Sequence, residues 1–122
     1  MDIRETGIIL FCEDYELVLK FYSEQLGMKI RQRGKDLSIL DFGGSYLMLE
    51  ENGVASDIEK TRSQNPTVIR LNVNNFDLAV SEIVARGVNV EVKSFEWGTI
   101  GVVIDPEGNR RSAPWSHPLV FR

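Results

Sequence analysis

Residues 7–27 read GIILFCEDYELVLKFYSEQLG and combine a strand pattern with a helix pattern. Gly7–Cys12 is an uninterrupted apolar run between charged residues, a pattern typical of a buried strand. Asp14 stands where an N-cap is expected, and apolar residues recur at three- and four-residue spacing from Tyr15 to Leu26. Gly27 follows at the position of a left-handed C-cap. The stretch therefore predicts a strand followed by an amphipathic helix.

The same order returns about sixty residues later in TVIRLNVNNFDLAVSEIVARG, residues 67–87. Here we expect a strand over Thr67–Val73, an N-cap at Asn75 and a helix over Phe76–Arg86 that Gly87 ends. Each helix precedes three strand-like runs, which are Met28–Arg33, Leu37–Phe42 and Tyr46–Glu50 in the first copy and Val88–Phe95, Thr99–Ile104 and Arg110–Trp115 in the second. The repeat predicts an α+β fold of two tandem βαβββ modules.

Residues 51–66 lack a sustained apolar pattern and predict a connection, with one short helical turn at Asp57–Thr61. We expect a single domain over residues 1–122, with module 1 at 1–51, a linker at 52–66 and module 2 at 67–122. Each helix covers one face of its sheet, so the two free faces of these curved mixed sheets are expected to form a cleft. A linker of this length leaves open whether the modules pair within one chain or across two.

Composition excludes several functions. The 122 residues include one cysteine, Cys12, and one histidine, His117, so neither an intrachain disulfide nor a site with two imidazoles is available. The net charge of −4 lacks the basic footprint of nucleic-acid binding. No run approaches the ~20 apolar residues of a membrane span, and acids near the N-terminus argue against a signal peptide. We expect a cytoplasmic protein that binds neither nucleic acid nor membranes.

Two motifs then carry a family resemblance. Phe21-Tyr22 precedes Leu26-Gly27 at the end of the first helix, and Asp105-Pro106-Glu107-Gly108-Asn109 precedes the last strand. With the repeat, the chain resembles the vicinal-oxygen-chelate superfamily, which includes glyoxalase I, extradiol dioxygenases, fosfomycin-resistance enzymes and bleomycin-resistance proteins. The Trp97-Gly98 pair resembles the bleomycin-resistance branch in particular. The resemblance implies the glyoxalase/bleomycin-resistance fold of paired modules, often in a homodimer.

In the enzymes of this superfamily a divalent metal sits on the open sheet face, held by His or Gln at the start of each module and by Glu in each last strand. The matching positions in this chain are Gly7, Val68, Met48 and Ser112. None of these is a good ligand for such a metal, because glycine and valine lack donor atoms, a thioether suits soft copper and a neutral hydroxyl binds weakly. The resemblance therefore predicts no metal or other cofactor and favours the bleomycin-resistance branch, which sequesters its ligand without a metal.

Strand alternation predicts which side chains face the cleft. If Gly7 faces inward, Phe11 shares its face, while Ile8, Leu10 and Cys12 pack under the helix. The predicted ligand-binding set is Phe11, Tyr46, Met48, Glu50, Arg70, Asn72, Trp97 and Ser112. Arg70 lies between Ile69 and Leu71, where its guanidinium either recognises a carboxylate, phosphate or sulfate of a ligand or pairs with Glu50 or lies at the sheet edge.

The predicted function is the sequestration of a small, partly aromatic and anionic molecule, and no catalytic residue is assigned. Two alternatives stay open: a lyase, isomerase or dioxygenase-like enzyme of the same fold, with Glu50 or Tyr46 as acid/base, and a cleft filled by side chains in a protein that only assembles. His117 and Trp115 are expected to pack or lie exposed. Arg111 stands where the family has an apolar residue, which leaves the register of the last strand open.

Overall fold

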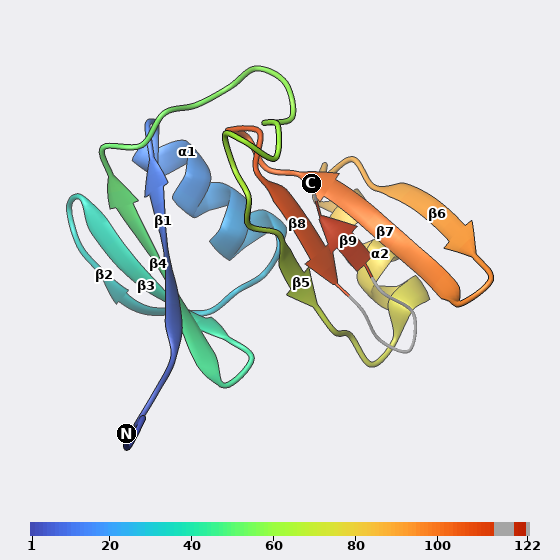
Figure 1. The fold of residues 1–122 in the computed structure, drawn as a ribbon, viewed down its shortest axis with the longest axis horizontal. Coiled ribbons are helices and arrows are strands. Elements are labelled where there is room, and N and C mark those ends of the chain that lie inside the picture. Colours follow the sequence, from blue (N-terminus) through green and yellow to red (C-terminus); the bar gives the residue numbers. More distant parts are fainter. Residues whose placement is uncertain (114–118, 122) are drawn as a thin grey trace. The chain divides into compact units, whose positions relative to one another are not determined.

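The computed structural model describes the backbone of residues 1–113 and 119–121 and the side chains of residues 1–109. The chain divides into two compact units, Met1–Ala55 and Ser56–Arg122. Each unit has its own mixed sheet and its own α-helix (Figure 1). The predicted α+β fold with βαβββ modules is therefore confirmed.

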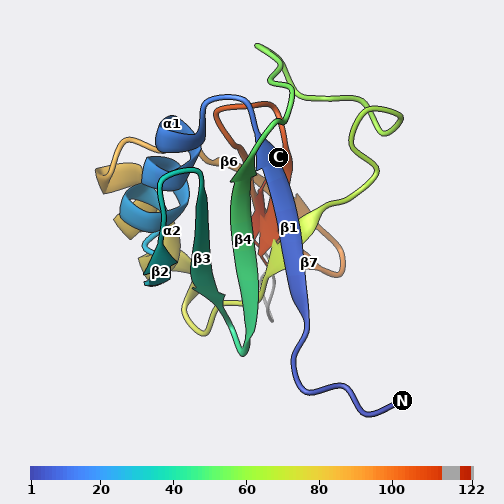
Figure 2. The same cartoon turned by 90° about the vertical axis from the view of Figure 1, so that its left-hand side faces the viewer.

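Unit 1 contains one βαβββ module. Its elements are β1 (Gly7–Cys12), α1 (Tyr15–Lys20), a π-helical turn η1 (Phe21–Gln25), β2 (Ile30–Arg33), β3 (Leu37–Phe42) and β4 (Ser45–Glu51). The strand order is β1-β4-β3-β2, with β1 parallel to β4 and the remaining pairs antiparallel. Figure 2 shows β3, β4 and β1 side by side in this order. The parallel pair arises because α1 carries the chain from the end of β1 back across the sheet.

The first helix begins and ends where the sequence predicts. Asp14 caps it, its carboxylate accepting from the Leu17 backbone N–H at 3.2 Å. From Phe21 the backbone widens into the π-helical turn, and the Ser23 hydroxyl donates to the Leu19 carbonyl at 2.6 Å. Gly27 follows with φ of +82°, the left-handed conformation that favours glycine. The predicted single helix is thus a short α-helix continued by a π turn.

The core of unit 1 lies between this helix and one face of the sheet. From the helix come Tyr15, Val18, Leu19, Phe21 and Tyr22, and from the sheet come Cys12, Leu40, Leu47 and Leu49, all buried. The Tyr15 hydroxyl bonds to the buried Ser38 hydroxyl of β3, which identifies the face that α1 covers. Alternate residues of β4 therefore lie under the helix, as the period of two predicts.

Unit 2 repeats the order and adds one strand. Its elements are β5 (Ile69–Leu71), α2 (Phe76–Ala85), β6 (Glu91–Phe95), β7 (Gly98–Ile104), β8 (Arg110–Ala113) and β9 (Leu119–Phe121), in the sheet order β5-β8-β9-β7-β6. Asn75 caps α2 by accepting from the Leu78 N–H at 3.1 Å, and Gly87 ends it with φ of +88°. Both caps agree with the prediction.

The Asp105–Asn109 turn of unit 2 is closed by hydrogen bonds to the Asp105 side chain. The Asp105 carboxylate accepts from the backbone N–H groups of Glu107 and Asn109, each at 2.9 Å, and from the Asn109 side chain at 3.0 Å. The segment after Ser56 is bonded to this turn, since Lys60 donates from its backbone to Gly108 at 2.8 Å and from its side chain to Asn109 at 3.1 Å. Part of the predicted linker is therefore anchored to unit 2.

Several predicted boundaries are wrong. β5 is shorter than Thr67–Val73 and leaves Val68 and Asn72 outside the strand, and β6 begins only at Glu91. The predicted helical turn at Asp57–Thr61 is absent; a turn at residues 62–64 follows instead. Trp115 and His117 lie outside the described residues. No helix in the described part of the chain is long and apolar enough to cross a membrane.

Candidate functional site

The open face of unit 1 is the sheet face opposite α1, and its residues form three cross-strand rows. These rows are Gly7–Tyr46–Asp41, Ile9–Met48–Ile39 and Phe11–Glu50–Leu37, running from β1 through β4 to β3. Paired residues of neighbouring strands project to the same face. Ile9 and Phe11 are about half exposed, and the paired residues of β4 and β3 are half-buried. An apolar surface with few charges is therefore available to a ligand.

Gly7 and Tyr46 form a close contact at one end of this face. A Cβ on Gly7 would lie 2.2 Å from both Cε2 and Cζ of the Tyr46 ring. The ring therefore occupies the space that any side chain at residue 7 would enter. Only glycine leaves room for the ring in this position.

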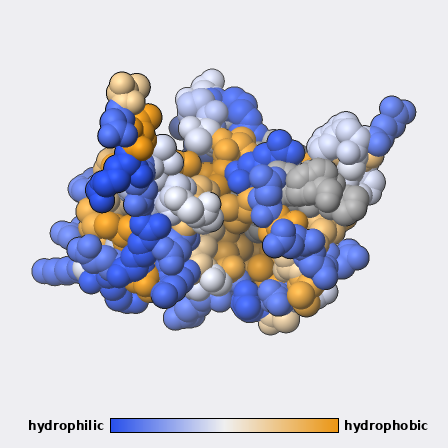
Figure 3. All heavy atoms as spheres, turned by 90° about the horizontal axis from the view of Figure 1, so that it is seen from below, coloured by the Kyte–Doolittle hydropathy of each residue, from blue (hydrophilic) through white to orange (hydrophobic). Residues whose placement is uncertain are grey.

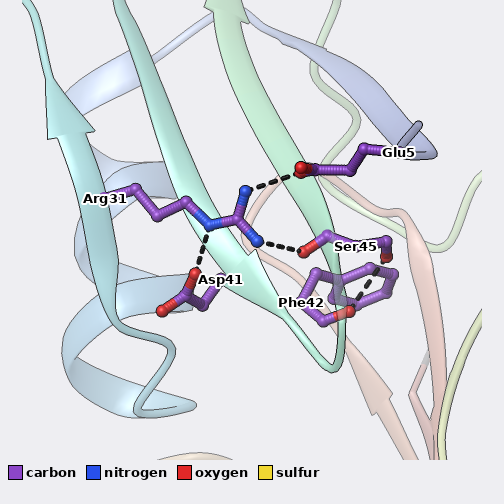
Figure 4. A network of polar contacts seen from close by, with 5 residues as sticks. All are labelled: Glu5, Arg31, Asp41, Phe42 and Ser45. Atoms are coloured by element: carbon purple, nitrogen blue, oxygen red, sulfur yellow. Dashed lines mark hydrogen bonds and ion pairs between the residues drawn. The ribbon is translucent and has the colours of Figure 1, made fainter.

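Arg31, which the sequence pattern does not indicate as a site residue, holds the polar end of the face together. Its Nε donates to Asp41, its Nη1 donates to Glu5 at 2.6 Å, and its Nη2 donates to the Ser45 carbonyl at 3.0 Å (Figure 4). These contacts raise the pKa of Arg31 above its ordinary value, chiefly through the hydrogen bond with Asp41 and next through that with Glu5. The register of β2 against β3 shifts between Ile30 and Gln32, at Arg31. A bulge of this kind leaves no signal in the sequence pattern.

Glu50 differs from Asp41 and Glu5, whose carboxylates are bonded to Arg31. Its side chain is half-buried and is the central member of the row that joins Phe11 and Leu37. Within the part of the chain that the structure describes, the Glu50 carboxylate has neither an ion pair nor a hydrogen bond. As far as residues 1–109 are concerned, the open face of unit 1 thus presents one carboxylate without a partner.

In unit 2 the predicted alternation around β5 also holds. Ile69 is 3% exposed, whereas Val68, Arg70 and Asn72 are exposed. Among the described residues Arg70 forms no ion pair. The Arg70 guanidinium is therefore accessible to an anionic group.

The backbone pairing of β8 gives its register against β5 and β7, which the sequence leaves open. Ser112 is paired with Arg70 of β5 and Val102 of β7, while Arg111 is paired with Ile69. The predicted binding residues Arg70 and Ser112 therefore occupy neighbouring positions of one sheet row.

Trp97 has an aromatic partner that the sequence analysis did not include. Its ring stacks on Phe95 with a centroid distance of 5.1 Å and an interplanar angle of 2°. The two residues are 61% and 47% exposed, at the connection from β6 to β7. The alternation Phe95-Glu96-Trp97 across a tight connection could have indicated the pair. The stack holds a flat aromatic surface in solvent.

The residues at the family's metal positions do not fit a divalent metal. Gly7 and Val68 offer no donor atom, and Met48 offers only a thioether. Within residues 1–109, whose side chains are described, no group of three His, Cys, Asp or Glu side chains could hold a metal ion. The buried Cys12 sulfur donates to the Leu10 carbonyl at 3.5 Å, in the core position that the sequence predicts. No metal-based step is therefore assigned to these residues.

A separate depression lies beside α1. It has a volume of about 490 Å³ and is lined by Asp14, Glu16, Leu17, Leu19, Lys20, Ser23, Glu24 and Arg33. Its charges largely compensate one another, and Arg33 pairs with Glu16 at 3.0 Å. On the face drawn in Figure 3, hydrophobic residues reach the surface between hydrophilic ones. The depression contains none of the predicted binding residues.

Comparison with known proteins identifies the family. Residues 6–111 match the model of the Glyoxalase/Bleomycin resistance protein/Dioxygenase superfamily. No curated protein shows significant sequence similarity to the chain.

Several solved structures share the fold. A glyoxalase/bleomycin resistance protein/dioxygenase from Alicyclobacillus acidocaldarius has a TM-score of 0.71 at 20% identity, covering 96% of this chain and 88% of its own. TioX from Micromonospora has a TM-score of 0.69 at 18% identity, with 96% and 95% covered. A lactoylglutathione lyase from Agrobacterium tumefaciens has a TM-score of 0.66 at 13% identity, with 94% and 90% covered. At these identities the likeness shows the fold alone.

Proposed function

This chain belongs to the glyoxalase/bleomycin resistance protein/dioxygenase superfamily, and from that premise we propose that it binds and sequesters a small, partly aromatic molecule without a metal ion. Proteins of this superfamily typically bind small molecules. The proposal assigns the chain to the binding proteins of the superfamily rather than to its metal-dependent enzymes. We include a homodimer in the proposal, which sedimentation analysis can test.

The contact between Gly7 and Tyr46 is the main observation that supports the proposal. In the metal-dependent members, residue 7 would supply a ligand, but here it has no side chain, and the Tyr46 ring fills the adjacent space. Met48, at the second position of the same unit, offers a sulfur atom that hard and borderline ions bind poorly. Both positions of unit 1 favour contact with apolar or aromatic groups over coordination of a metal.

In unit 1 the proposed binding residues belong to the open sheet face, and in unit 2 they belong to β5, to the residue that follows it by one position, to the exposed connection from β6 to β7 and to β8. In unit 1 they are Phe11, Tyr46, Met48 and Glu50, and in unit 2 they are Arg70, Asn72, Trp97 and Ser112. Phe95 joins this set because it supports the Trp97 ring. The exposed rings supply apolar area, and the exposed Arg70 guanidinium supplies a group for an acidic substituent.

Calorimetry with aromatic carboxylates, starting from phenylacetate, tests the role of Arg70. Arg70→Ala should weaken binding by about 1.5–3 kcal/mol, because a charge-assisted hydrogen bond is lost. Arg86→Ala, at the C-terminal end of α2, removes the same charge outside the proposed set and serves as the control. Equal affinity in the wild type and Arg70→Ala would remove Arg70 from the set.

A further inference from the structure

The carboxylates on the open face of unit 1 differ in whether a positively charged side chain pairs with them. The three rows of this face contain two carboxylates, Asp41 and Glu50. Asp41 is bonded to Arg31, whose guanidinium also bonds to Glu5 and the Ser45 carbonyl. Glu50 has no ion pair or hydrogen bond among the residues that the structure describes. Among the described residues, Glu50 is therefore the carboxylate of these rows that has no protein partner, and its charge is the one that a ligand cation can pair with.

The surroundings of Glu50 determine which ligand groups it tolerates. Its cross-strand neighbours are Phe11 and Leu37, and Met48 precedes it by two residues on the same face. A ligand that covers these apolar side chains also displaces water from the carboxylate. Removing water from a charge is costly unless a partner replaces it, so a neutral ligand is disfavoured and an anionic one is repelled. An organic cation supplies the missing partner.

Phe11 adds a second attraction for the same kind of group. Its side chain is 50% exposed and belongs to the same row as Glu50. Phe11 and Glu50 are partners on neighbouring strands, which lie about 4.8 Å apart, so one ammonium group can contact both the carboxylate and the aromatic ring. We infer that the open face of unit 1 binds the cationic amine end of a ligand, with Glu50 as its counter-ion and Phe11 as its aromatic neighbour. This inference rests on the proposed binding function and extends it to the charge of the ligand.

Three probes of matched shape test the inference: 2-phenylethylammonium, the neutral 2-phenylethanol and the anionic phenylacetate. Each is titrated into ¹⁵N-labelled protein, and backbone amide shifts report both the affinity and the place of binding. The ammonium probe should bind the wild type and shift the amides of Phe11, Leu37 and Met48. Glu50→Gln should weaken its binding about tenfold, since a charge-assisted contact is lost. The affinity for 2-phenylethanol should change little.

Glu51→Gln is the matched control, because Glu51 is the next residue of β4, is exposed and projects away from the open face. It removes the same net charge and should leave the affinity for the ammonium probe unchanged. Equal losses in the two variants, or none in Glu50→Gln, would overturn the inference. Binding of phenylacetate or 2-phenylethanol without binding of the ammonium probe would also overturn it, while leaving the proposed function in place. Failure of all three probes to bind would count against both.

Discussion

The ring of Tyr46 on β4 lies against Gly7 on β1, where a Cβ on Gly7 would be 2.2 Å from Cζ of the ring. Gly7 and Tyr46 are direct partners in the parallel pair of strands. The contact links two features of the sequence, the absence of a side chain at residue 7 and the presence of an aromatic ring at its partner position on β4. Glycine at residue 7 is thus part of the packing of an aromatic side chain on the open face.

Gly7→Ala tests this contact. We expect the substitution to lower the free energy of unfolding by about 1–3 kcal/mol, because the added methyl group displaces the Tyr46 ring. In a Tyr46→Ala background the same substitution should cost much less, since the space beside residue 7 is then empty. Urea denaturation of the four proteins in this double-mutant cycle measures the coupling. Equal costs in both backgrounds would show that Gly7 is required for another reason.

The alternation along β4 predicts two unequal losses of stability. Leu49→Ala should cost about 2–5 kcal/mol, because Leu49 is fully buried beneath α1 and its loss leaves a cavity. Met48→Ala should cost about 1 kcal/mol, because Met48 is half-buried on the open face. Denaturant unfolding monitored by circular dichroism compares the two. A larger loss for Met48→Ala would reverse the assignment of the faces.

The N-cap of α2 offers a closely matched pair of variants. Asn75→Ala should destabilise unit 2 by about 1 kcal/mol, because its side chain accepts from the Leu78 N–H. Asn74→Ala, one residue earlier and exposed, should have little effect. Hydrogen exchange of amides in α2 detects the difference locally. Similar protection in both variants would contradict the role of the cap.

The Arg31 contacts predict a stability difference that depends on salt but not on pH near neutrality. Asp41 and Glu5 raise the pKa of Arg31, so its stabilisation is fully present below the ordinary arginine pKa and is lost only as pH rises through the raised value. The melting temperature of Arg31→Met should therefore lie below that of the wild type by the same amount at about pH 7 and about pH 9. The gap should narrow in about 0.5 M NaCl, because these side chains are partly exposed. A gap that stays the same in salt would show that lost packing, rather than lost charge pairing, causes the difference.

The sequence predicts most of the fold because the spacing of apolar residues and the residues that cap helices are both local features of the chain. Asp14, Asn75, Gly27 and Gly87 all begin or end helices where their chemistry predicts. The limits of β5 were not predicted, because the apolar alternation of Val68 to Val73 continues beyond the three residues that pair with other strands. Local pattern does not specify how far a neighbouring strand extends.

The candidate site was only partly predictable. Alternation placed Phe11, Tyr46 and Glu50 on one face, but the Gly7–Tyr46 contact depends on the register of two strands far apart in sequence. Arg31 was missed because a register shift beside it alters the alternation of β2. The stacking of Phe95 on Trp97 follows from the local geometry of a connection. The Gly7–Tyr46 contact and the contacts of Arg31 need the folded backbone, since each joins residues whose separation in the sequence does not specify their contact.

The most direct test of metal-independent binding is one thermal-shift screen of chelator-treated protein. Divalent Mn, Fe, Ni and Zn are tested alone, and aromatic acids, aromatic amines and drugs of the bleomycin type are tested in the presence of EDTA. Because ligands that bind the folded state raise its melting temperature, we predict stabilisation by at least one aromatic compound in EDTA and none by the metals. Stabilisation by a metal, or by an aromatic compound only when a metal is present, would contradict the account.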